Sequence, residues 1–194
     1  MHKLHKRTFL VIDAGIGLSL ATIGASLNLA TLKAAPTKTH MPSDSPMLLA
    51  QKLEKDDILA AHNKYRLEVG VPSLKWSDSL ANSAQKWAEQ LASTGSFEHS
   101  SSQYGENLWA GTSEAYSQTQ MVDDWGDEKQ YFIPNSSFPN TCRENWSQCG
   151  HYTQIIWKDT QQVGCGLATN KKTKNDYFVC QYNPPGNYEG QKPY

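Results

Sequence analysis

The sequence lacks the motifs that would assign a chemistry at once. It contains no HExxH segment and no GxSxG segment, so neither a zincin nor a serine nucleophile elbow is indicated. It has no internal repeat and no stripe of lysine and arginine. Without residues 1–35 its formal net charge falls from −1 to −4. A mildly acidic chain of this kind argues against a nucleic-acid partner.

The first residues have the layout of a secretory signal peptide. The basic segment MHKLHKR precedes a mostly apolar run, and small residues follow in KAAPT. We predict cleavage between Ala30 and Pro36 and a secreted or periplasmic protein. Because the run is long for a signal sequence, an uncleaved membrane anchor is the alternative, and it is the one route by which we expect membrane contact. The predicted organisation is a signal peptide over residues 1–35, a polar linker over residues 36–52 and a folded domain over residues 53–194.

Cysteine is absent before residue 142, and the chain has four in all: Cys142, Cys149, Cys165 and Cys180. An even number of cysteines behind an export signal favours disulfides over free thiols or a zinc–thiolate site. Three pairings are open to four cysteines. We predict Cys142–Cys149, which closes a short loop, and Cys165–Cys180, which would join two strands of a hairpin.

Hydrophobic periodicity indicates an α+β domain with helices packed on a sheet. Helices are predicted over residues 56–71, 77–95 and 113–132. The segments VGCGLATN and YFVCQYN, joined by the polar KKTKND, indicate a β-hairpin. GHYTQIIW fits either a helical turn or a strand. His62 falls on the apolar stripe of the first helix, which predicts a buried histidine rather than a ligand.

Four segments in order resemble the CAP superfamily, which groups cysteine-rich secretory proteins, venom antigen-five proteins and plant pathogenesis-related proteins of the first group. They are FEHSSSQYGENLWAG, VDDWGDEKQYF, CGHYTQIIWKDTQQVGCG and CQYNPPGNYEGQKPY. The resemblance runs from about Leu53 to Tyr194 and is nearest to the plant branch, whose members usually carry more cysteines. It implies a three-layer α/β/α sandwich with a central, largely antiparallel sheet.

The resemblance also implies a cleft lined by two histidines and two glutamates, which correspond to His99, Glu106, Glu128 and His151. His99 and His151 would then hold Zn²⁺ in a weak site, because catalytic zinc normally has three protein ligands. A hydrogen-bonded tetrad without metal is the alternative.

The resemblance favours a non-enzymatic extracellular protein with a role in defence or stress, and we expect a monomer. Its ligand would be a small apolar molecule such as a lipid or sterol, or a cell-wall component. The loop at residues 131–134 and Phe138 offer apolar surface for such a ligand, or pack into the core. One alternative is a metal-dependent hydrolase with Glu106 or Glu128 as general base. Another is a precursor that releases a C-terminal peptide after cleavage between Asn183 and Pro184.

Overall fold

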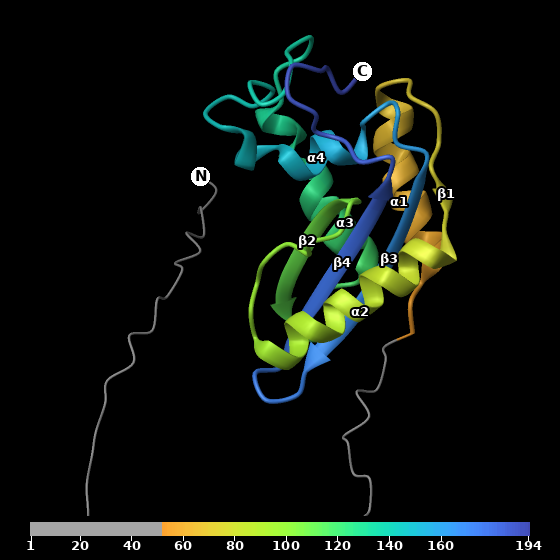
Figure 1. Cartoon of the computed structure of the whole chain (residues 1–194), viewed down its shortest axis with the longest axis vertical. Coiled ribbons are helices and arrows are strands. Elements are labelled where there is room, and N and C mark those ends of the chain that lie inside the picture. Colours follow the sequence, from red (N-terminus) through yellow and green to blue (C-terminus); the bar gives the residue numbers. More distant parts are fainter. Residues whose placement is uncertain (1–51) are drawn as a thin grey trace, which may run out of the picture. The chain divides into compact units, whose positions relative to one another are not determined.

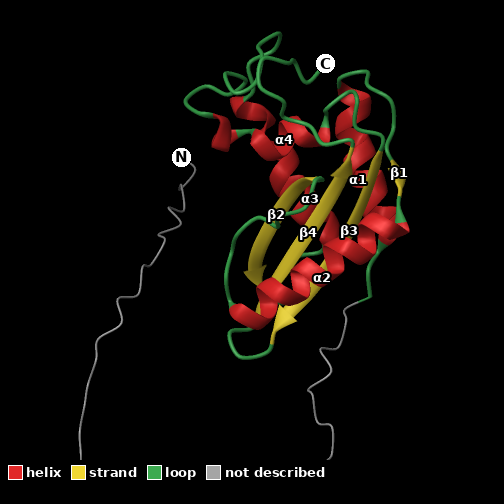
Figure 2. Cartoon of the chain, viewed as in Figure 1, coloured by secondary structure: helices red, strands yellow, loops and turns green. Residues whose placement is uncertain are grey.

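The computed structural model describes residues 52–194. In this part of the chain a four-stranded sheet is covered on both faces by helices, which gives the predicted three layers (Figures 1 and 2). The predicted signal peptide, the anchor alternative and all but the last residue of the predicted linker lie outside the described residues. No helix within residues 52–194 is both long enough and apolar enough to cross a membrane.

The sheet has the strand order β1-β3-β4-β2. Its strands are β1 (Lys75–Trp76), β2 (Gly105–Thr112), β3 (Gln162–Asn170) and β4 (Asn175–Asn183). The predicted hairpin is confirmed as β3 and β4, and β2 pairs antiparallel with the other edge of β4. The short edge strand β1 runs parallel to β3, so the sheet is mixed rather than purely antiparallel.

Each face of the sheet is covered by its own set of helices, as Figure 1 shows. The helices are α1 (Lys55–Glu68), α2 (Asp78–Thr94), α3 (Gln118–Gly126) and α4 (Gly150–Ile155), with 3-10 turns η1 (Asp127–Tyr131) and η2 (Trp146–Gln148). α2 buries Ala84, Ala88 and Leu91 against Val179 of β4. The other helices pack on the opposite face, where Trp125 of α3 stacks on Phe178 at 5.4 Å between ring centroids.

The predicted limits of α2 are confirmed by its caps. The Ser77 side chain accepts a hydrogen bond from the backbone of Leu80, and Gly95 ends the helix in the left-handed conformation with φ of 75°. The third helix was predicted to start too early, at residue 113. Residues 113–117 are not helical, because Ser117 is the N-cap and forms a capping box with Gln120, so α3 starts at Gln118.

The ambiguous segment GHYTQIIW is helical over Gly150–Ile155, which is α4, and its last two residues lie outside the helix. Its C-terminal end is stabilised by Arg66 of α1, whose guanidinium is fully buried. Arg66 donates to the carbonyl oxygens of Ile155 at 2.8 Å, Trp157 at 2.8 Å and Thr160 at 3.0 Å. The last carbonyls of a helix have no hydrogen-bond partner within the helix. The Arg66 guanidinium supplies the missing donor at the end of α4 and in the residues that follow it.

Both disulfides have the predicted pairing. Cys165 and Cys180 face each other in the β3–β4 register, with their Cα atoms 4.1 Å apart. Cys142 and Cys149 are joined across a sequence separation of 7 residues. This second bridge fixes the residue that immediately precedes α4.

The C-terminal tail lies against the domain. Phe138 donates a backbone hydrogen bond to Gln191, and Lys158 donates one to Pro193, each of 2.8 Å. Tyr188 packs edge-on against Trp157 with ring centroids 6.3 Å apart. These contacts oppose release of the tail, although Asn183 and Pro184 are themselves exposed.

Candidate functional site

Glu106 holds His99 at one side of the candidate site. Nδ1 of His99 lies 3.0 Å from Oε1 of Glu106, so the carboxylate fixes the tautomer in which Nδ1 carries the proton. Ser100 adds a backbone and a hydroxyl donor, and Gln181 donates from Nε2 at 3.0 Å. Burial disfavours the charged form of Glu106, but the bonds from His99, Gln181 and Ser100 outweigh burial and lower the pKa of the carboxyl.

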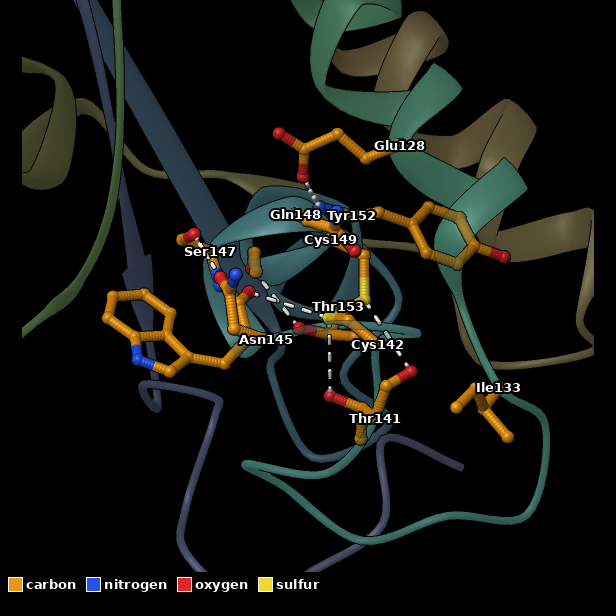
Figure 3. Close-up of a disulfide and its surroundings, with 12 residues drawn as sticks. Glu128, Ile133, Thr141, Cys142, Asn145, Ser147, Gln148, Cys149, Tyr152 and Thr153 are labelled. Atoms are coloured by element: carbon orange, nitrogen blue, oxygen red, sulfur yellow. Dashed lines mark hydrogen bonds between the residues drawn. A yellow bond between two sulfur atoms is a disulfide. The ribbon is translucent and has the colours of Figure 1, made fainter.

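Glu128 holds His151 in the same way. Nδ1 of His151 lies 2.7 Å from Oε1 of Glu128. The other carboxylate oxygen accepts from the backbone nitrogens of His151 at 3.1 Å and Tyr152 at 3.2 Å, which belong to the first turn of α4. Figure 3 shows Glu128 bonded to this turn, next to the Cys142–Cys149 bridge. Glu128 therefore both caps α4 and orients the imidazole.

His99, Glu106 and His151 line one cleft of about 260 Å³. Glu128 is not among the lining residues and acts through His151. The cleft also has an aromatic rim, because Phe97 and Trp146 line it while 57% and 52% of their surface is exposed. These two aromatic residues were not predicted as site residues from the sequence. Neither residue lies in a stretch with helical or strand periodicity, so no sequence pattern indicated that it would lie beside the histidines.

The bonding of both carboxylates limits the chemistry of the cleft. Glu106 accepts four hydrogen bonds, and its lowered pKa makes it a poor proton acceptor near neutral pH. Glu128 is engaged by α4. The arrangement gives no support to the alternative in which Glu106 or Glu128 serves as general base.

The imidazoles are the groups that could hold a metal. With Nδ1 of His99 and His151 turned to a carboxylate, Nε2 is the ligating nitrogen that each ring has left, as in many zinc sites. Within residues 52–194, however, these side chains do not form a cluster of three potential ligand atoms within 4.8 Å of one another. The donor set fits a two-imidazole site completed by water and does not fit a closed structural zinc site.

A different cluster meets that distance criterion but is unsuited to metal. His62 lies beside Cys165 and Cys180 in the core. Their sulfurs form a disulfide and are not thiolates. Both ring nitrogens of His62 are also engaged, by the carbonyl of Ile58 at 2.8 Å and the hydroxyl of Tyr182 at 2.9 Å. His62 is a buried core histidine, as its position on the apolar stripe predicted.

The aromatic loop is divided between core and surface. Phe132 is half-buried and contacts Tyr152, with ring centroids 5.5 Å apart. Tyr131 and Ile133 are exposed. Phe138 lies 6.1 Å from Trp146, ring to ring, and so supports the rim of the cleft from outside.

The chain is similar to known proteins both in sequence and in fold. Residues 59–182 match the model of the CAP, or cysteine-rich secretory protein, family. Pathogenesis-related protein 1A of Nicotiana tabacum is 44% identical over 141 residues, which cover 72% of this chain and 80% of the relative. The solved structure of BmVAL-1 is similar at a TM-score of 0.61 and 26% identity, covering 77% of this chain and 85% of that chain. A structure of NaASP2 with Zn²⁺ has a TM-score of 0.62 at 22% identity, covering 75% and 86%, which shows likeness of fold alone.

Proposed function

Because this chain belongs to the cysteine-rich secretory protein (CAP) family, we propose that it is an extracellular, non-enzymatic binding protein with a role in defence. The tobacco relative carries the name pathogenesis-related protein, which supports the defence role. The two disulfides support secretion, because such bonds persist in oxidising compartments.

The ligand proposed for the cleft is a small amphipathic molecule such as a lipid or sterol, with a cell-wall component as the second class. The observation that carries this proposal is the combination of exposed aromatic rings with polar groups in one cleft. Phe97 and Trp146 offer apolar contact at the rim, while His99 and His151 offer hydrogen-bonding groups in the same lining. A concave site that mixes apolar walls with a few placed polar groups is typical of small-molecule binding.

The same cleft is proposed to hold a divalent metal through Nε2 of His99 and His151. Zn²⁺ in that position would supply a Lewis acid and an anchor for a polar headgroup. A fold neighbour has been solved with Zn²⁺, which is in keeping with this proposal. The protein's own part is to orient both rings through Glu106 and Glu128.

Mass spectrometry of lipids extracted from the secreted protein tests the proposal. We expect an apolar ligand in a stoichiometric amount, and less of it in a variant that combines Phe97→Ser with Trp146→Ser. A lipid-free protein that hydrolyses ester or peptide substrates in a His151-dependent manner would instead favour the hydrolase alternative.

A further inference from the structure

A second concave site lies on the α2 face of the sheet, next to the cleft but separate from it. It is an open hollow of about 430 Å³. Its lining comes from α2, from the loop before β2 and from β4: Ser83, Lys86, Trp87, Gln90, Ser100, Ser101, Ser102 and Gln181. The α2 members are spaced i, i+3, i+4 and i+7, so they form one face of the helix.

Gln181 of β4 is the buried member of the lining. Its side chain is 1% exposed, and Nε2 donates to Glu106. Turning the amide over would bring its oxygen against the carboxylate of Glu106, so the orientation is fixed. Oε1 is left as the one buried side-chain oxygen in residues 52–194 that has no hydrogen-bond partner there. Such groups are rare in folded proteins. Because this oxygen is buried, it is not offered to a ligand, and Gln181 forms a fixed part of the wall of the hollow.

Four polar side chains of the hollow are available to a ligand. Ser83, Lys86, Gln90 and Ser101 make no side-chain hydrogen bond or ion pair with another described residue. Trp87 is half-buried, and its indole Nε1 donates to the carbonyl of Glu98 at 3.1 Å, which fixes the ring. The hollow therefore joins one immobilised aromatic ring to a set of hydroxyl, amide and ammonium groups.

We propose that this hollow binds a pyranose unit of an oligosaccharide. A sugar ring has an apolar C–H face that packs on an aromatic side chain, and a rim of hydroxyls that both donate and accept. Trp87 suits the face, and Ser83, Gln90 and Ser101 suit the rim.

Charge and polarity argue for a saccharide over other classes. Lys86 is the single cation of the hollow, which is too few for a nucleic-acid backbone. The many serine and amide groups would be left without partners under a lipid chain, and that is costly. Lys86 can accommodate a neutral sugar or pair with a uronate. This assignment does not rest on ligand binding in the His99–His151 cleft.

Isothermal titration calorimetry on the secreted protein tests the assignment, with laminarihexaose as the neutral probe and hexagalacturonate as the acidic one. We expect at least one to bind, with Trp87→Ala weakening binding about tenfold or more and Gln90→Ala about threefold. Trp76→Ala and Glu89→Ala are the matched controls, since neither residue lines the hollow, and both should bind as the parent does. If the acidic probe alone binds, Lys86→Ala should remove that binding.

Absence of binding by both probes would overturn the proposal. So would equal affinities in folded Trp87→Ala, Gln90→Ala and the parent. Gln90 is exposed on α2, so its substitution tests the site even if Trp87→Ala fails to fold. Loss of saccharide binding in Phe97→Ser would place the sugar in the neighbouring cleft instead and would also contradict the assignment.

Discussion

The hydroxyl of Tyr182 donates a 2.9 Å hydrogen bond to Nε2 of His62, and both side chains are fully buried. The same oxygen accepts from Asn107, whose amide also donates to the backbone carbonyl of His151. A continuous polar chain thus runs from α1 through the sheet to the floor of the cleft. Its integrity depends on a neutral His62, because Nδ1 already donates to Ile58.

His62 should make the fold sensitive to mild acid. Burial lowers its pKa from 6.5 to about 4, the bond to Ile58 opposes this, and the charge of Arg66 reinforces it. Between these values the unfolded chain binds a proton that the folded chain does not, so stability falls as pH drops from 6.5 to 4, by about 3 kcal/mol in all. Urea unfolding of His62→Gln should show a weaker pH dependence in this window. An unchanged dependence would refute the assignment.

Glu106 should add a separate loss of stability at lower pH. A carboxyl whose folded pKa lies below its ordinary value of 4.5 stabilises the fold above that pH, and the contribution is lost as pH falls through the folded pKa. Glu106→Gln should therefore flatten the stability curve below about pH 4.5 and leave the region near pH 6 unaltered. Urea unfolding at closely spaced pH values separates this group from His62. A flattened curve near pH 6 instead would contradict the prediction.

Arg66 should be among the most sensitive positions in the domain. Arg66→Met would leave the carbonyls of Ile155, Trp157 and Thr160 without their donor, at a cost of about 3–5 kcal/mol in the free energy of unfolding. Lys75→Met, at an exposed position, is the matched control and should change stability by about 0.5 kcal/mol or less. Equal effects of the two substitutions would show that Arg66 does not support α4.

Zinc binding should depend on both histidines of the cleft. Calorimetric titration with ZnCl₂ should give a modest affinity that weakens on acidification, because a protonated imidazole cannot coordinate. The double variant of His99→Ala and His151→Ala should lose it. Glu128→Gln should retain weaker binding, since the amide still accepts from the ring but orients it less firmly. Identical titrations for parent and double variant would remove the cleft as the metal site.

The Cys142–Cys149 bridge should matter for the cleft as well as for stability. Replacing both residues by alanine removes a short closed loop and should cost about 2–4 kcal/mol. It should also weaken zinc binding, because the bridge fixes the residue before His151. Replacement of Cys165 and Cys180 should destabilise the domain while leaving zinc affinity nearly unaltered in the folded fraction. Similar effects of the two pairs on zinc affinity would contradict this division of roles.

Local patterns were sufficient to predict the hairpin, both disulfides and α2. Two short β-type segments joined by a polar turn predicted the hairpin, and its register in the structure pairs Cys165 with Cys180 as expected. Ser77 and Gly95 mark the ends of α2 by their own capping chemistry. The start of α3 was missed because the capping preference of Ser117 competed with a longer periodic pattern. A capping box at Ser117 and Gln120 was readable in the sequence.

Long-range contacts explain what the sequence did not predict. Arg66 lies one turn after His62 on the stripe of α1, and this position was a signal that it is buried. Its carbonyl partners are far away in the sequence, so no local pattern around Arg66 predicts these hydrogen bonds. The hydrogen bond from Gln181 to Glu106 depends on the pairing of β2 with β4, so no motif near either residue predicts it.

Equilibrium binding of a fluorescent sterol tests whether the cleft with its aromatic rim is a ligand site. The parent protein should bind in a saturable manner with one site per chain. The combined Phe97→Ser and Trp146→Ser variant should bind about tenfold more weakly or worse. Leu67→Ser is the control, because Leu67 is 81% exposed on α1 and does not line the cleft, and it should bind as the parent does. No saturable binding by the parent, or equal affinity in all three proteins, would contradict the account.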